Sequence, residues 1–249
     1  MNGAADVSED ALLGGRIKFF QPVRGYRAAI DPVILAASVP AGAGEEVLDV
    51  GSGAGAAALC LAARIPGVRV TGLESRAHLV DLARRNGDAN GLGESVRFLC
   101  GDLLDAGIPF QPQSFHHVMA NPPFAESGRG NPPPDADKAA ANVEGKATLA
   151  HWIDFCLKMV RPKGTLSIIH RADRLDAVLA ALAGRLGGTV VYPLWPGSGG
   201  KPAKRVVVRG RPGVGALMTL SPGLVLHERD GSYTREAEAV LRHARALEL

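Results

Sequence analysis

The sequence predicts an α/β fold with a mostly parallel sheet, helices on both of its faces and an antiparallel hairpin at one edge. From residue 46 onward, short apolar runs alternate with Ala- and Leu-rich stretches, and glycine, proline or asparagine marks the junctions. Five strand-then-helix units in succession favour parallel strands, because each helix returns the chain to the same edge of the sheet. Two further strand-like runs, 189–194 and 204–209, flank a Gly/Pro loop and provide the hairpin.

The elements of this core are expected in regular order. Strands are predicted over 46–50, 68–73, 96–100, 115–120 and 165–170, and helices over 56–64, 77–90, 139–160 and 173–186. A helix precedes them, for which Asp31 is the expected N-cap and Pro32 the first helical residue. After the hairpin we expect a strand over 224–227 and a helix over 235–247. Four segments result: a flexible tail (1–14), an N-terminal arm and helix covering the pocket (15–45), the core (46–212) and a C-terminal extension (213–249).

Composition narrows the class of protein. The 249 residues are 46% hydrophobic and 21% charged, with a net charge of +3 that mildly favours an anionic partner. The three cysteines lie far apart without a CxxC pair, which indicates a reducing compartment and no structural metal. A signal-like N-terminus and an apolar stretch of roughly 18 residues are both missing. We therefore expect a cytoplasmic protein without membrane association, and either a monomer or a homodimer.

Distinctive residues follow four successive strands, and this convergence is the main functional signal. In parallel sheets, ligands bind at the carboxyl ends of the strands. The first strand carries Asp49 and runs into Gly51-Ser52-Gly53-Ala54-Gly55, the second ends at Glu74-Ser75, and the third leads to Asp102-Leu103. The GxGxG spacing and the two extra carboxylates disfavour a dinucleotide, whose diphosphate is anionic. They favour S-adenosylmethionine, which carries an ammonium and a sulfonium.

Each acid has an expected role toward that cofactor. Asp49 holds the methionine ammonium, Glu74 accepts from both ribose hydroxyls, and Asp102 accepts from the adenine amino group with Leu103 against the ring. Taken singly, each of these acids is equally explained as a helix cap or a solvated turn residue. A dinucleotide enzyme remains the alternative for the set.

The fourth strand ends in Asn121-Pro122-Pro123-Phe124. The two prolines hold the backbone extended and forbid further strand pairing, although Asn-Pro-Pro is also a common turn. The Asn121 oxygen and the Pro122 carbonyl are suited to accept the two N–H bonds of a planar amine, and Phe124 to stack on its ring. These residues are the expected catalytic group, acting by orientation and preorganised electrostatics.

This set of motifs resembles class I methyltransferases of the (D/N/S)PP(Y/F) kind, which implies a Rossmann-like, seven-stranded sheet. The opening Phe20-Gln21-Pro22, Gly25-Tyr26-Arg27 and Asp31 to Ala37, and the closing Pro202 to Val208, resemble the bacterial tRNA1(Val) adenine-N6 methyltransferase family. The resemblance implies transfer of a methyl group from S-adenosylmethionine to an anticodon-loop adenine. It also implies that Tyr26, Arg27 and Asp31 cover the cofactor or substrate pocket.

A basic segment near the end of the core is the expected RNA-binding surface, and an ordinary solvated edge strand is its alternative. Its members are Lys201, Lys204, Arg205, Arg209 and Arg211. Arg129 and Lys138 are expected to contribute from a lid. The competing functions are a ribosomal RNA guanine-N2 methyltransferase, a glutamine methyltransferase acting on release factors, and a non-catalytic RNA-binding module on the same fold.

Overall fold

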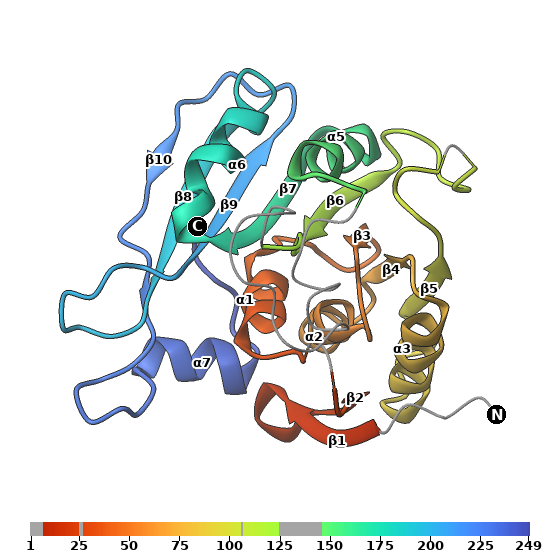
Figure 1. Ribbon diagram of the computed structural model, residues 1–249, viewed down its shortest axis with the longest axis horizontal. Helices are drawn as coiled ribbons and strands as arrows, with labels where there is room; N and C mark the ends of the chain where they lie inside the picture. The colour runs from red at the N-terminus through yellow and green to blue at the C-terminus, as the bar shows by residue number, and fades with distance from the viewer. Residues whose placement is uncertain (1–6, 25–26, 106, 125–145) are drawn as a thin grey trace.

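The computed structural model describes residues 7–24, 27–105, 107–124 and 146–249 (Figure 1). Its centre is one sheet with the strand order β10-β8-β9-β7-β6-β3-β4-β5, and β11 also pairs with β8. Seven strands form the body of this sheet: β3 (Glu46–Val50), β4 (Arg69–Glu74), β5 (Val96–Cys100), β6 (Phe115–Ala120), β7 (Val160–Arg171), β8 (Gly187–Trp195) and β9 (Arg205–Arg211).

The predicted mostly parallel sheet with an antiparallel hairpin is confirmed. β3 pairs in parallel with β4 and β6, whereas β9 runs antiparallel to both β7 and β8. Two short strands, β10 (Thr219–Leu220) and β11 (Leu224–Val225), extend the sheet beside β8. The sequence predicts only the second of these, because the first is a two-residue exposed pairing without an apolar run.

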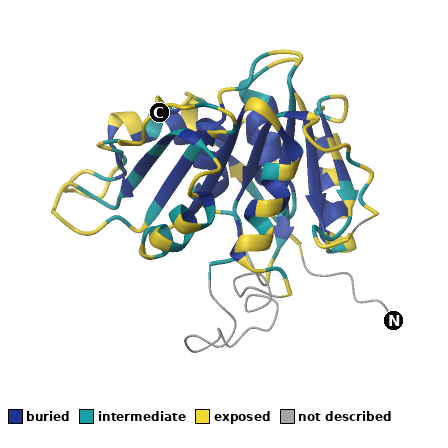
Figure 2. Ribbon diagram, turned by 90° about the horizontal axis from the view of Figure 1, so that it is seen from above, coloured by how far each residue is buried: buried dark blue, intermediate teal, exposed yellow. Residues whose placement is uncertain are grey.

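Helices cover both faces of the sheet (Figure 1). The apolar core of one face includes α1 (Ile30–Ser38), α2 (Ala56–Arg64), α3 (Ala77–Ala89) and α7 (Arg235–His243), and that of the other includes α5 (Leu149–Met159) and α6 (Leu175–Leu182). Figure 2 shows the strands buried between these layers. Within the described ranges, every helix is too short or too polar to cross a membrane.

The expected flexible tail is wrong for its described part. Residues Val7–Leu12 form β1, which pairs antiparallel with β2 (Ile17–Pro22) as a separate two-stranded sheet around the 3-10 turn η1 (Leu13–Gly15). Burial of apolar side chains explains this order, since Ile17 and Phe19 are almost fully enclosed in the same core as α1 and α2. The run 15–22 already suggests a short strand or arm in the sequence, whereas the acidic, small residues before it do not reveal its partner strand β1.

Two asparagines of α3 attach the β1–β2 hairpin to the core. Asn86 accepts from the Phe20 N–H at 2.8 Å and donates to the Phe20 carbonyl at 2.8 Å. Asn90 makes the same pair of contacts with Lys18, at 2.9 and 2.7 Å. Asn86 also donates to the carbonyl of Ala54 at 3.0 Å, so one side chain joins the hairpin to the glycine-rich loop. A side-chain amide is suited to this because it offers a donor and an acceptor together.

Several expected helix boundaries differ from those observed. α6 and α7 end at Leu182 and His243, four residues before their predicted ends. α1 is capped by Ala29, without a side-chain cap, so Asp31 lies inside the helix and does not act as N-cap. α5 starts at Leu149, where Thr148 and His151 form a reciprocal cap, and of the expected segment 139–160 residues 139–145 lie outside the described residues. β7 already begins at Val160, and a register shift there accommodates Lys163 at φ +63°.

Candidate active site

The strand register places the predicted site residues in one row. Val50 pairs with both Ala120 and Leu73, and Glu74 pairs with Cys100. The next residues along β3 and β6, Gly51 and Asn121, therefore lie beside each other at the same carboxyl edge. Three strand spacings separate Asn121 from Cys100, which is roughly 14 Å. The row is long enough for an elongated ligand with its reactive end toward Asn121.

The glycine-rich loop folds over the end of β4. The N–H groups of Gly51 and Ser52 both donate to the Leu73 carbonyl, at 2.8 and 3.0 Å. Gly51 has φ +72°, and a Cβ there would overlap the ring of Trp152. A Cβ at Gly55, which has φ +90° and precedes α2, would lie 2.7 Å from the Phe98 ring. Both positions therefore require glycine for backbone conformation and for space.

Gly53 is different, because among the described residues, its chain neighbours apart, no atom lies within 4 Å of where its Cβ would be. Its N–H donates to Glu74 Oε2 at 2.9 Å. Gly53 borders open space beside the carboxylate of Glu74. A ligand is expected to approach the protein backbone closely at this place.

Asp49 is a buried carboxylate, and one of its oxygens lacks a hydrogen-bond partner among the described residues. The residue is 3% exposed, and the oxygen in question is Oδ2. Burial, with the negative charge of Glu74 as a smaller cause, raises the pKa of Asp49 to about 7. An isolated buried carboxylate is costly unless a cation or donor pairs with it. A ligand ammonium supplies both, so the site fits the predicted role of Asp49.

Glu74 is equally buried but is already oriented. Its Oε2 accepts from Gly53 N, and its Oε1 accepts from Arg76 N at 3.0 Å and from Arg76 Nε at 2.8 Å. A carboxylate offers about four acceptor positions, so a ribose diol can still bind to it. Ser75, the next residue, is exposed.

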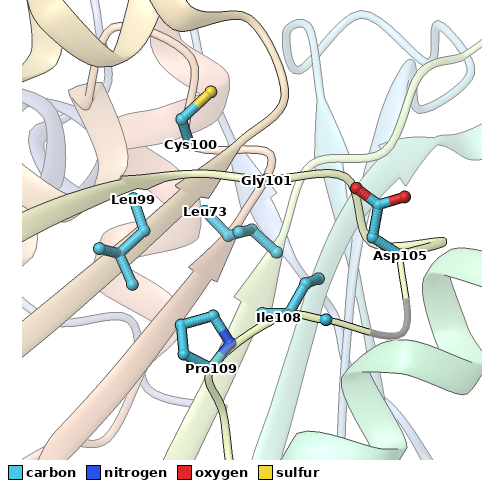
Figure 3. Close-up of a pocket in the computed structure, with 8 residues that line it drawn as sticks. Leu73, Leu99, Cys100, Gly101, Asp105, Ile108 and Pro109 are labelled. Atoms are coloured by element: carbon cyan, nitrogen blue, oxygen red, sulfur yellow. The ribbon is translucent and has the colours of Figure 1, made fainter.

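A cavity of about 430 Å³ lies next to the ends of β4 and β5, within the range of small-molecule sites (Figure 3). Its lining is mixed apolar and polar, and consists of Leu73, Leu99, Cys100, Gly101, Asp105, Gly107, Ile108 and Pro109. Asp102 follows Gly101, and its Oδ1 accepts from Leu104 N at 3.0 Å while Oδ2 makes no hydrogen bond within the described part of the chain. Leu103 packs against the neighbouring core.

The fourth strand delivers Asn121 and the prolines to the same edge. Asn121 and Phe124 are half-buried, and Pro122 is buried. The Phe124 ring has two neighbours from other strands: the guanidinium of Arg205, 4.7 Å from the ring centroid, and the ring of His170, at 5.5 Å between centroids. The structure therefore brings the Asn121 motif beside the glycine loop, in the position that the sequence predicts.

Of the three residues expected to cover the pocket, the structure describes two, and these two have different partners. Tyr26 lies outside the described residues. Arg27 is exposed and pairs with Asp10 of β1 at 2.6 Å, which ties it to the hairpin. Asp31 accepts from Arg205 Nε at 2.7 Å. Of the two that are described, Asp31 thus connects to the Asn121 motif through Arg205.

The five basic residues of the closing segment fall into two groups, exposed lysines and arginines that bind other groups of the protein. Lys201 and Lys204 are exposed. Arg209 donates to the carbonyls of Ser38 and Leu249, at 3.1 and 2.6 Å, and Arg211 donates to the Lys163 carbonyl at 2.9 Å. Of the three guanidinium groups, those of Arg209 and Arg211 therefore bind the protein's own backbone, and that of Arg205 binds Asp31. Arg129 and Lys138 lie outside the described residues.

Sequence reasoning missed three residues that support the site. Arg76 pairs with Glu74, Asn86 holds the glycine loop, and His170 contacts Phe124. The position of Arg76, two residues after a strand-end acid, is the only one with a local signal. The contacts of Asn86 and His170 depend on segments far apart in the chain.

Comparison with known proteins agrees with the geometry. Residues 47–143 match the model of a methyltransferase domain. A tRNA1(Val) (adenine(37)-N6)-methyltransferase from Porphyromonas gingivalis is 31% identical over 222 residues, covering 85% of this chain and 81% of the relative. A relative of the same name from Aeromonas hydrophila is 27% identical, covering 84% and 85%. A release factor glutamine methyltransferase from Chlorobaculum tepidum is 43% identical, but over only 31% of this chain and 27% of its own length.

Solved structures give the same assignment of the fold. A crystal structure from Agrobacterium tumefaciens, described as a predicted O-methyltransferase, superposes with a TM-score of 0.72 at 26% identity, covering 88% of this chain and 98% of that one. The match to this release factor methyltransferase covers 31% of the chain, whereas the two adenine-N6 relatives match 84–85% of it. The chain thus belongs to the class I S-adenosylmethionine-dependent methyltransferases, in the tRNA1(Val) (adenine(37)-N6)-methyltransferase family.

Proposed function

We propose that this methyltransferase modifies the N6 amino group of an adenine in the anticodon loop of a valine tRNA. The observation that carries the proposal is the place of Asn121-Pro122-Pro123-Phe124 at the end of β6, directly beside Gly51. Relatives that span most of the chain are named for adenine 37 of tRNA1(Val), which supports this substrate. The release factor relatives match between 31% and 55% of the chain, which disfavours a protein substrate.

The cofactor-holding residues are proposed to be those of the strand-end row. Asp49 binds the ammonium, Glu74 the ribose hydroxyls, and Asp102 the adenine amino group, while Gly53 leaves room for the ligand. When bound, S-adenosylmethionine supplies an electrophilic methyl group on a sulfonium. Ser52 and Gly55 act indirectly, because they shape the loop that carries these contacts.

The motif residues are proposed to prepare the acceptor. The lone pair of an aromatic amine is delocalised into its ring and is a poor nucleophile. If the Asn121 oxygen and the Pro122 carbonyl each accept one N–H bond, the amine is held with its lone pair directed at the methyl donor. Phe124 stacks on the base and Pro123 keeps the backbone extended. A base within a helix must first be flipped out, whereas a loop base is already accessible.

RNA contacts are proposed for the exposed part of the basic segment. Lys201 and Lys204 lie in the loop between β8 and β9, and Lys204 directly precedes the strand that brings Arg205 to Phe124. Lysines at this position are suited to hold phosphates beside the inserted base, in a salt-dependent manner. Arg209 and Arg211 contribute by holding the strand in place.

Labelled methyl transfer tests the function directly. The protein is incubated with radiolabelled S-adenosylmethionine and total tRNA, and nucleosides are separated after digestion. Label is expected in N6-methyladenosine, in valine tRNA. A valine tRNA transcript with guanosine in place of the anticodon-loop adenine is the matched control and should stay unlabelled. Label confined to ribosomal RNA or to protein would contradict the proposal.

The cofactor's place predicts selective protection of one cysteine. Cys60 and Cys156 are buried, and burial raises the pKa of the Cys60 thiol to about 12. Cys100 is exposed, with its Sγ atom 3.7 Å from the Ser75 carbonyl. We expect N-ethylmaleimide to label Cys100 first, and bound S-adenosylhomocysteine to slow this labelling.

Intact-protein mass spectrometry after short labelling pulses measures the effect. The Cys100→Ser variant, which should lose the fast label altogether, identifies the reactive thiol. An unchanged labelling rate at saturating S-adenosylhomocysteine would place the adenosine elsewhere.

A further inference from the structure

The Phe124 ring is held by side chains that reach it from both faces of the sheet. In the register, His170 pairs with Val206 and Arg171 pairs with Arg205. Neighbouring residues of a strand point to opposite faces, so His170 lies on the face of α5 and α6 and Arg205 on the face of α1. Phe124 sits at the strand ends between them.

The two contacts differ in kind. The Arg205 guanidinium lies over the Phe124 ring, 4.7 Å from its centroid. The His170 ring is nearly perpendicular to Phe124, with an interplanar angle of 86°. The guanidinium thus lies over the phenyl ring, whereas the two aromatic rings form a T-shaped pair.

Arg205 is itself fixed by Asp31. Its Nε donates to Asp31 Oδ2 at 2.7 Å, and one terminal nitrogen donates to the Lys204 carbonyl at 3.2 Å. The Asp31 side chain is 12% exposed and that of Arg205 is 30% exposed, so the ion pair is largely shielded from water. Charge-assisted hydrogen bonds in such surroundings are stronger than at an open surface.

His170 adds rigidity without charge. It is 1% exposed, and neither of its ring nitrogens has a hydrogen-bond partner among the described residues. Burial lowers the pKa of His170 to about 4, so the ring is neutral at physiological pH. The positive charge beside Phe124 therefore comes from Arg205.

We propose that Arg205, anchored by Asp31, is a positioning residue that lies over the Phe124 ring and holds it in the plane in which it meets the acceptor base. The inference rests on the proposed function, since it assigns a task to Phe124 in base stacking. A cation over an aromatic ring is attracted by the ring's negative face, and this fixes the ring plane before substrate arrives. Asp31 is thereby assigned to the acceptor side of the site.

If Arg205 instead contacted an RNA phosphate, replacing Asp31 would have the opposite effect from the one expected for the positioning role. If Arg205 served the RNA backbone, Asp31→Asn would free the guanidinium and remove a repelling charge, so RNA would bind more tightly. In the positioning role, Asp31→Asn and Arg205→Ala both lower kcat/KM for RNA, by roughly 3- to 30-fold. The double variant should be no worse than Arg205→Ala alone, because both changes disrupt one unit.

Kinetics on the full-length protein with valine tRNA test this. Arg205→Lys, which keeps the charge but lacks the planar group, should recover activity only partly. The dependence of RNA affinity on salt should keep its slope, whereas a lost phosphate contact lowers the slope by about one. The ion pair between Arg185 and Asp154, 2.6 Å long and distant from these strand ends, provides Arg185→Ala and Asp154→Asn as matched controls with unchanged kcat/KM.

A readout without RNA separates this inference from the proposed function. In protein labelled with 4-fluorophenylalanine, the Phe124 signal is assigned by its loss in Phe124→Tyr. Asp31→Asn should shift and broaden that signal while the Kd for S-adenosylhomocysteine stays within about twofold of wild type, less than 0.5 kcal/mol. An unshifted Phe124 signal, or tighter RNA binding by Asp31→Asn, would overturn the positioning role. Failure of the wild-type protein to methylate tRNA would instead overturn the proposed substrate.

Discussion

Replacing Asn121 with alanine is expected to lower methyl transfer by at least about 100-fold and to leave cofactor affinity nearly unchanged. Asn121 follows the last paired residue of β6, and we propose that it serves the acceptor whereas Asp49 and Glu74 hold the cofactor. Removing a hydrogen-bond acceptor for the amine is therefore expected to lower the rate of methyl transfer and not the affinity for the cofactor. Single-turnover rates and calorimetry with S-adenosylhomocysteine measure the two quantities separately.

Asn121→Asp is the matched variant, because it keeps an acceptor oxygen at the same distance from the backbone. We expect it to retain more activity than Asn121→Ala. If Asn121→Ala instead loses cofactor binding together with transfer, Asn121 belongs to the cofactor's own contacts.

Replacing Asp49 with asparagine is expected to stabilise the free protein at alkaline pH and to abolish tight cofactor binding. Burial, aided by the charge of Glu74, raises the pKa of Asp49 from 3.8 to about 7 in the folded state. A raised carboxyl pKa means that stability is fully present below pH 4 and falls as pH rises toward 7. The difference between variant and wild type should therefore grow across this window, to about 4 kcal/mol at most.

Urea unfolding at pH 5 and pH 8, with and without S-adenosylhomocysteine, measures both effects. Bound ligand should stabilise the wild type but not Asp49→Asn, so the ranking of the two proteins reverses when ligand is added. Asp81→Asn, which removes an exposed carboxylate of α3, controls for the change in net charge. Equal ligand stabilisation of Asp49→Asn and wild type would exclude Asp49 as the ammonium partner.

The part of the site that could be predicted from sequence is the part that follows from the repeated strand-then-helix unit. Each parallel strand ends at the same edge, so Asp49, Glu74, Asp102 and Asn121 converge once the strands are identified. The glycines of the loop carry a local signal as well. Their spacing alone gives the tight turn, although not the contact of Gly51 with Trp152.

The remainder depends on contacts between distant segments. Asp31 and Arg205 are 174 residues apart, and locally Asp31 before Pro32 has the features of a helix cap. Arg209 has the features of a surface charge on an edge strand, but its strand pairs on both sides and its side chain reaches the Leu249 carbonyl. Charge and spacing specify the chemistry of a residue, whereas topology decides which partner it meets.

The asparagine contacts of α3 couple two parts of the molecule that lie far apart in the chain. They join the β1–β2 hairpin to residues 66 and 72 positions later. Because Asn86 also binds the Ala54 carbonyl, one side chain links the docking of the hairpin to the conformation of the glycine-rich loop. A change that undocks the hairpin is therefore expected to loosen this loop as well.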